Sequence, residues 1–156
     1  MLDQLKELLE MQKALDKAML KERGIEKYPS DEMRIALFVE LGELMNELPS
    51  RFKVWKKSPV DNREKALEEY ADCLAFKMSI YNHSYTDKWC DNALFKYNEC
   101  IAETSSLFEL IDISFNVSTL STFFALGNKL GFTWEEVYQA YKKKNQVNYE
   151  SLTKGY

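Results

Sequence analysis

The 156-residue sequence has a single histidine, His83, and only three cysteines. A zinc site built from Cys and His is therefore not expected, and neither is a catalytic triad that relies on histidine. The cysteines are odd in number and lack ligand-like spacing, which fits a reduced setting, so we expect a cytoplasmic protein. No run of 18 apolar residues occurs and the chain is charged from Asp3 onward, so neither a membrane span nor a signal peptide is expected.

Glycine and proline are also scarce, with five and three residues, so the chain has few helix breakers. Hydrophobic residues make up 46% of the sequence, which is typical of a globular protein. The net charge is −4 and the basic residues are scattered, which argues against nucleic acid as the main partner. We expect a single all-α domain over residues 1–156, folded as a compact bundle of about six helices.

Apolar residues recur every three to four positions through most of the chain, as they do in amphipathic helices. Three helix starts carry capping signals: Ser30 as an N-cap, Asp61 in a capping-box-like sequence, and Thr133 in a capping box with Glu136. Gly131 is typical of a helix end. The predicted helices cover residues 3–21, 31–48, 62–81, 92–111 with a point of interruption at 105–106, 118–130 and 134–145. Loops are expected at residues 22–30, 49–61, 82–93 (with His83 and Trp89) and 111–116, and a frayed tail at 145–156.

Two acidic pairs dominate the second and third predicted helices: Glu40 with Glu43, and Glu69 with Asp72. Residues three apart share one helix face, so each pair directs both carboxylates to the same place. Both pairs are set into an apolar face, where like charges need to be neutralised. Mg²⁺ does this well, because it prefers oxygen ligands and works with substrate phosphates. For either pair alone, a solvated helix face would be the simpler interpretation.

The connector between these two helices is short, so we expect them to lie antiparallel, with the acidic pairs facing each other across a cation. The connector combines the aromatic residues Phe52 and Trp55 with Lys53, Lys56 and Lys57. This composition suits base stacking and phosphate contact. The alternative is that the aromatic rings fill the core while the lysines remain in water.

Gln12 occupies a position in the first predicted helix where the three-to-four-residue periodicity predicts an apolar residue. Asp16 lies one turn later. An amide offers both a donor and an acceptor, which suits the edge of a pyrimidine. The alternative is a tolerated polar residue at a helix–helix seam, where it sets the register.

The order E-x-x-E, a gap, then E-x-x-D resembles that of the all-α nucleoside triphosphate pyrophosphohydrolases, which include the dimeric dUTPases and the MazG-like enzymes. Three further segments are most similar to the dimeric dUTPase family, including its bacteriophage members. They are the Gln motif LEMQKALD at 9–16, FKVWKK at 52–57, and YKKKNQVN at 141–148 with the final Gly155-Tyr156. The sequence departs from the family at Ser151-Leu152, where Arg-Gln usually follows and the arginine is expected to contact phosphate.

The resemblance implies a homodimer that hydrolyses dUTP to dUMP and pyrophosphate with two or more Mg²⁺ ions. The metal ligands would be Glu40, Glu43, Glu69 and Asp72, and Glu40 or Glu43 would orient the attacking water or take its proton. Gln12 and Asn82 would read the uracil edge, and Trp55 would line the base or stack on it. The residues implied to hold phosphate oxygens are Lys56, Lys144, Asn145 and Asn148. Asp16 is a further residue implied to contact the substrate. The tail at 145–156 would close over the active site.

Other functions are compatible with these patterns. One is a related MazG-like pyrophosphohydrolase acting on dCTP or another nucleotide. A second is a non-enzymatic helical protein whose carboxylates hold a structural ion and whose surface binds a partner protein, and a third is an assembly protein without a site. A regulatory protein partner is compatible with enzymatic activity.

Overall fold

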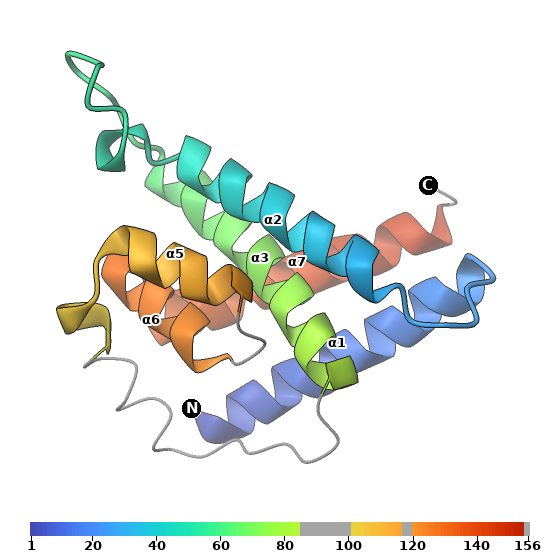
Figure 1. Cartoon of the computed structure of the whole chain (residues 1–156). Coiled ribbons are helices and arrows are strands. Elements are labelled where there is room, and N and C mark those ends of the chain that lie inside the picture. Colours follow the sequence, from blue (N-terminus) through green and yellow to red (C-terminus); the bar gives the residue numbers. More distant parts are fainter. Residues whose placement is uncertain (85–100, 117–119, 155–156) are drawn as a thin grey trace.

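Two long helices, α2 (Ser30–Asn46) and α3 (Arg63–Ser84), run antiparallel through the middle of the molecule (Figure 1). The computed structural model describes residues 1–84, 101–116 and 120–154, and these are helical or irregular with no strand among them. Both the all-α class and the antiparallel arrangement of the two acidic helices are therefore confirmed. None of the helices in these ranges is long and apolar enough to cross a membrane.

The remaining helices pack on two sides of this pair. α1 (Leu2–Glu22) and α7 (Trp134–Thr153) lie beside each other against α3, while α5 (Leu107–Asn116) and α6 (Ser121–Leu130) form a second pair (Figure 1). The short 3-10 helix η1 (Pro49–Arg51) begins the connector from α2 to α3, which extends away from the bundle. Leucines, alanines and aromatic residues from α1, α2, α3, α5, α6 and α7 form one continuous core.

Tyr70 of α3 packs against α6 and is hydrogen-bonded to it. It is 1% exposed, its hydroxyl donates a 2.8 Å hydrogen bond to the carbonyl of Phe123, and its ring stacks on the Phe123 ring at 4.5 Å. The contact requires a glycine opposite, because a Cβ at Gly127 would lie 2.5 Å from the Tyr70 hydroxyl oxygen. Gly127 therefore allows α6 to approach α3 closely.

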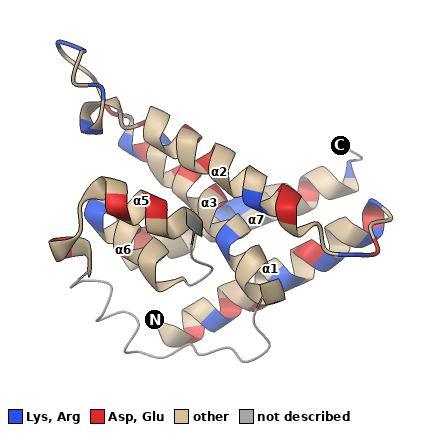
Figure 2. Cartoon of the chain, viewed as in Figure 1, with Lys and Arg blue, Asp and Glu red and all other residues tan. Residues whose placement is uncertain are grey.

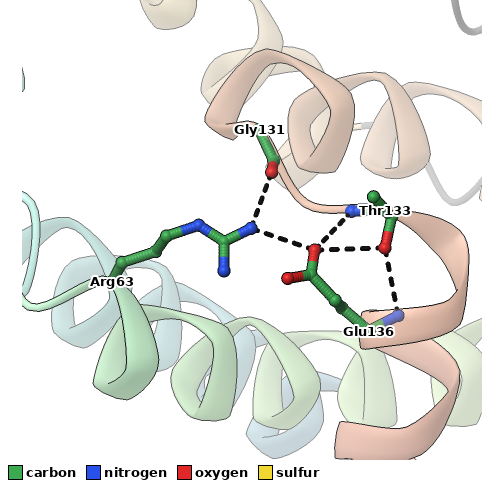
Figure 3. A network of polar contacts seen from close by, with 4 residues as sticks. All are labelled: Arg63, Gly131, Thr133 and Glu136. Atoms are coloured by element: carbon green, nitrogen blue, oxygen red, sulfur yellow. Dashed lines mark hydrogen bonds and ion pairs between the residues drawn. The ribbon is translucent and has the colours of Figure 1, made fainter.

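The start of α7 is tied to the start of α3 by a small polar network (Figure 3). Thr133 and Glu136 form the predicted capping box. Arg63 donates from Nη2 to the carbonyl oxygen of Gly131 at 2.8 Å and to Glu136 Oε2 at 2.9 Å. Gly131 ends α6 in the left-handed conformation, with φ 83°, as predicted for a glycine cap. The network fixes the line along which α7 crosses α3.

Two of the predicted caps are wrong. Ser30 is the first residue of α2 and makes no capping bond, and Pro29 holds the N-cap position. At the start of α3, Asn62 Oδ1 accepts from Lys65 N at 3.1 Å and acts as the cap. Asp61 does not cap because its carboxylate accepts hydrogen bonds from the backbone and side chain of Ser50 across the connector.

Three predicted boundaries also differ from the structure. Residues 111–116, expected as a loop, belong to α5, because Leu110 and Ser114 are one turn apart and fully buried. α7 does not end near residue 145 but continues to Thr153, since no Gly or Pro interrupts it and Gln146 pairs with Glu150 one turn on. Residues 82–84 lie in α3 instead of a loop. The predicted break at 105–106 is confirmed, and the expectations for 85–100, including Trp89, lie outside the described residues.

Candidate active site

Glu40 and Glu43 of α2 face Glu69 of α3 across the antiparallel pair. One carboxylate oxygen from each of the three residues lies within 4.8 Å of the other two. The burial is graded: Glu69 is buried, Glu40 is half-buried and Glu43 is exposed. The i, i+3 spacing on α2 and the antiparallel packing on α3 thus gather three of the four predicted metal ligands into one carboxylate cluster.

The fourth predicted ligand, Asp72, lies one turn further along α3 and is paired with a lysine from α7. Lys144 Nζ lies 2.7 Å from Asp72 Oδ2. A second lysine, Lys65, lies one turn before Glu69 on α3, and its Nζ is 3.0 Å from Glu69 Oε1. Figure 2 shows basic residues of α7 beside the acidic residues of α3. Each of the two carboxylates on α3 is therefore met by one ammonium group.

The cluster holds more negative charge than the two lysines neutralise. Burial raises the pKa of Glu40 to about 7, and Asp72, Glu43 and Glu69 add to the increase while Lys144 opposes it. Burial also raises the pKa of Asp72, against the opposing effect of Lys144. An all-oxygen donor set with excess negative charge fits a hard divalent cation such as Mg²⁺.

A cavity of about 380 Å³ opens beside the cluster, with Glu40, Asp72 and Lys144 in its wall. Its volume lies in the range typical of small-molecule sites. The apolar part of the wall consists of Leu15, Met19, Met33, Ala75, Phe76 and Leu152. Further polar side chains come from Gln12, Asp16, Arg23, Ser79, Asn148 and Ser151. Acidic residues, a lysine and an apolar wall thus meet in one hollow between α1, α2, α3 and α7.

The predicted base reader Gln12 is buried in a polar chain that links α1 with α7. Its Nε2 donates to Asp16 Oδ1 at 2.7 Å, and its Oε1 accepts from the hydroxyl of Tyr141 at 2.8 Å. Asn145 in turn donates from Nδ2 to the Tyr141 hydroxyl at 3.3 Å and is only 4% exposed. Both ends of the Gln12 amide are therefore bonded within the protein, and Asn145 lies behind the cavity wall.

Three other predicted contacts with substrate lie outside the cavity. Trp55 is 72% exposed and Lys56 is also exposed, both on the connector that extends away from the bundle (Figure 1). Asn82 donates from Nδ2 to the carbonyl of Leu9 at 3.0 Å and so joins α3 to α1. Within this single chain, none of the three reaches the cavity wall.

Sequence reasoning missed several residues of this site. Lys65 precedes Glu69 by four residues, and this i, i+4 charge pattern is visible in the sequence. Arg23 gave no comparable signal, and Tyr141 was noted only as the first residue of the motif at 141–148. Arg23 lines the cavity beyond the end of α1, and Tyr141 reaches Gln12 over 129 residues of sequence. Only the packing of α1 against α7 brings them to the site.

A search of the curated proteins finds no match. The family model described as dUTPase matches residues 4–156, which is nearly the whole chain. Its members act on the small molecule dUTP, and the family in general uses a divalent metal. The all-helical fold and this match together show that the chain belongs to the dUTPase family.

Proposed function

We propose that this chain is a Mg²⁺-dependent dUTP diphosphatase that converts dUTP to dUMP and pyrophosphate. The observation that carries the proposal is that Glu40 belongs both to the carboxylate cluster and to the wall of the 380 Å³ cavity. A nucleotide in the cavity would therefore present its phosphates to the cluster. Membership of the dUTPase family supports dUTP as the substrate.

Glu40, Glu43, Glu69 and Asp72 are the residues that would hold Mg²⁺, which when bound lowers the pKa of a coordinated water and offsets phosphate charge. Glu40 or Glu43 orients the attacking water or takes its proton.

The phosphates require cationic and amide groups, and the cavity wall offers Lys144 and Asn148. If Asp72 held a cation, the ammonium of Lys144 would leave its 2.7 Å ion pair with Asp72 and could bind a phosphate oxygen. Asn145, behind the wall, supports this arrangement through Tyr141.

We further propose that the working form is a homodimer. Ile35 and Phe38 on α2 are 64% and 62% exposed, and Val39 beside them is 49% exposed. These three side chains form an apolar face whose exposure to water is unfavourable. A second copy on this face would cover it. Trp55 and Lys56, which do not reach the cavity of their own chain, would then be available to the partner's substrate. The C-terminal segment 145–156 would close over the site, a role supported by Asn148, Ser151 and Leu152 in the cavity wall.

The test is pyrophosphate release from dUTP, dTTP, dCTP and dATP, with and without Mg²⁺. We expect fast, Mg²⁺-dependent release from dUTP and little from the others. Glu43→Gln should abolish turnover and leave the fold intact by circular dichroism. Glu32→Gln, an exposed change on the same helix, is the matched control. Turnover by Glu43→Gln at the wild-type rate would refute the site, and release from dCTP alone would refute dUTP as substrate.

A further inference from the structure

We propose that Arg23 binds the terminal phosphate of the substrate, so that the site favours a nucleoside triphosphate over the corresponding diphosphate. The inference rests on the proposed function and goes beyond it, because Arg23 lies outside the carboxylate cluster and outside every sequence motif that pointed to the site. It is carried by the position of Arg23 in the cavity wall, by its unpaired guanidinium and by the register of α7 against α1.

Arg23 is a cation that the protein itself leaves unpaired. The described part of the cavity wall contains two cationic side chains, Lys144 and Arg23. Lys144 is held 2.7 Å from Asp72 in an ion pair. The side chain of Arg23 makes no ion pair or hydrogen bond with any residue that the structure describes. Because Arg23 is also exposed, it stands at the open end of the cavity, where its guanidinium is free to bind an anion.

The backbone that carries this guanidinium is fixed by the end of α1. The backbone nitrogen of Arg23 donates to the carbonyl of Met19 at 3.0 Å. Ile25 N donates to Leu20 O at 2.9 Å, and Gly24 between them takes the left-handed conformation with φ 64°. A phosphate therefore needs to order only the arginine side chain, which limits the entropic cost of binding.

The register between α1 and α7 places Arg23 beside the last turn of α7. Three side-chain hydrogen bonds join the helices at separations of 130, 131 and 129 residues, between Gln4 and Trp134, Glu7 and Tyr138, and Gln12 and Tyr141. The helices thus run parallel with a constant offset, and their C-terminal ends lie on the same side of the molecule (Figure 1). At this offset Arg23 is level with the turn that contributes Ser151 and Leu152 to the cavity wall.

A row of polar side chains along α7 leads from the carboxylate cluster to Arg23. Lys144, Asn148 and Ser151 follow one another at i, i+4 and i+7, and all three lie in the cavity wall. In the register with α1, Lys144 and Arg23 are separated by about nine residues, or about 13 Å of helix rise. An arginine side chain on a helix leans toward the N-terminus, which shortens this gap. Phosphates that begin beside Lys144 would therefore follow the row toward Arg23.

The chemistry of the nucleotide indicates which of its groups Arg23 binds. The phosphates are its anionic groups, and a guanidinium binds phosphate oxygens through two parallel charge-assisted hydrogen bonds. The apolar residues of the wall lie mainly on α1, α2 and α3, opposite the polar row, and suit the base. A diphosphate lacks the group that would extend farthest from the cluster. Arg23 would therefore contribute to dUTP and not to dUDP.

Arg23→Gln tests the assignment when dUTP and dUDP are compared. We expect kcat/KM for dUTP to fall about ten- to hundredfold, and kcat/KM for dUDP to remain near the wild-type value. Arg23→Lys keeps the charge but loses the two-pronged geometry, so its loss should be intermediate. Lys21→Gln removes the same charge from an exposed position at the same helix end and is the matched control.

A second variant distinguishes a missing cation from a disturbed helix end. Ser151 lies in the same wall, so Ser151→Arg in the Arg23→Gln background should restore the preference for dUTP over dUDP. An equal loss for dUTP and dUDP in Arg23→Gln would overturn the proposal, because it would place Arg23 at the nucleoside or at a phosphate that both share. Unchanged kinetics with both nucleotides would overturn it as well.

Binding measurements separate this proposal from the proposed function. Calorimetric titration with the α,β-imido analogues of dUTP and dUDP in the presence of Mg²⁺ needs no turnover. A loss of affinity in Arg23→Gln that is confined to the triphosphate analogue would support the assignment even if the chain hydrolysed no dUTP. Hydrolysis of dUTP together with an unchanged ratio of the two affinities in Arg23→Gln would refute the role of Arg23 and leave the proposed function standing.

Discussion

Lys144 of α7 lies 2.7 Å from Asp72 of α3, and this ion pair joins the two helices at the edge of the carboxylate cluster. Burial raises the pKa of Asp72, and the hydrogen bond and charge of Lys144 oppose this increase. Because the same lysine lines the cavity, it connects the cluster to the space where a nucleotide would lie.

Lys144→Met should therefore lower kcat/KM for dUTP. A charge-assisted hydrogen bond to phosphate is lost, and we expect a decrease of about ten- to hundredfold. Steady-state kinetics of pyrophosphate release provide the measurement. Lys143→Met, at the exposed neighbouring position, is the control and should stay near the wild-type value. Equal activity of both variants would exclude a role for Lys144 in substrate binding.

Mg²⁺ should stabilise the folded chain even without substrate, because it binds the carboxylate cluster only when α2 and α3 are packed together. Saturation to about 100 times the dissociation constant adds about 2.7 kcal/mol, which corresponds to a rise in Tm of about 5–10 °C. Thermal unfolding with Mg²⁺ and with a chelator measures it. Glu69→Gln should reduce the rise, and Glu68→Gln, on the exposed neighbour, should not. A Tm independent of Mg²⁺ would contradict a metal site here.

The contact between Arg63 and Glu136 should make stability depend on pH in the acid range. The hydrogen bond from Arg63 is the main cause that lowers the pKa of Glu136 from 4.5 to about 2. The unfolded chain therefore binds more protons between these values, so the contribution is complete above about pH 4.5 and is lost as the pH falls to about 2. Both side chains are partly in solvent, so we expect only about 0.5–1 kcal/mol.

Urea denaturation of the wild type and Arg63→Gln tests this. The difference in free energy of unfolding should be largest at pH 6 and should shrink as the pH approaches 2.5. A difference that is constant with pH would mean that Arg63 stabilises the fold through Gly131 or the Phe132 ring alone.

Gly127→Ala should destabilise the fold, because the new methyl group would lie 2.5 Å from the Tyr70 hydroxyl oxygen and 2.8 Å from its Cζ. Relieving that clash displaces a ring that is hydrogen-bonded and stacked, and we expect a loss of about 1–3 kcal/mol. Gly42→Ala is the matched control. Nothing lies within 4 Å of a Cβ there, so helix propensity should make the change neutral or stabilising. Equal effects of the two substitutions in chemical denaturation would contradict the close packing of α6 on α3.

Local sequence patterns were sufficient for much of the fold. The capping box at Thr133, the glycine cap at Gly131 and the antiparallel acidic helices were all predicted, because each depends on residues close together in the sequence. The predictions failed where a distant partner competed. Asp61 is a good cap by residue type, but its carboxylate accepts hydrogen bonds from Ser50. Asn62 caps the start of α3 instead.

In the candidate site, too, some features were predictable from the sequence and others depended on tertiary packing. The sequence by itself determined the all-α class and the gathering of Glu40, Glu43 and Glu69, since helical periodicity and one short connector suffice for these. It also indicated the dUTPase family, through the resemblance of its motifs. The tertiary structure alone decided that Lys144 meets Asp72 and that Gln12 is hydrogen-bonded at both ends of its amide. These contacts depend on how α7 crosses α1 and α3. That crossing follows from packing between segments at least 50 residues apart in the sequence, which no local pattern encodes.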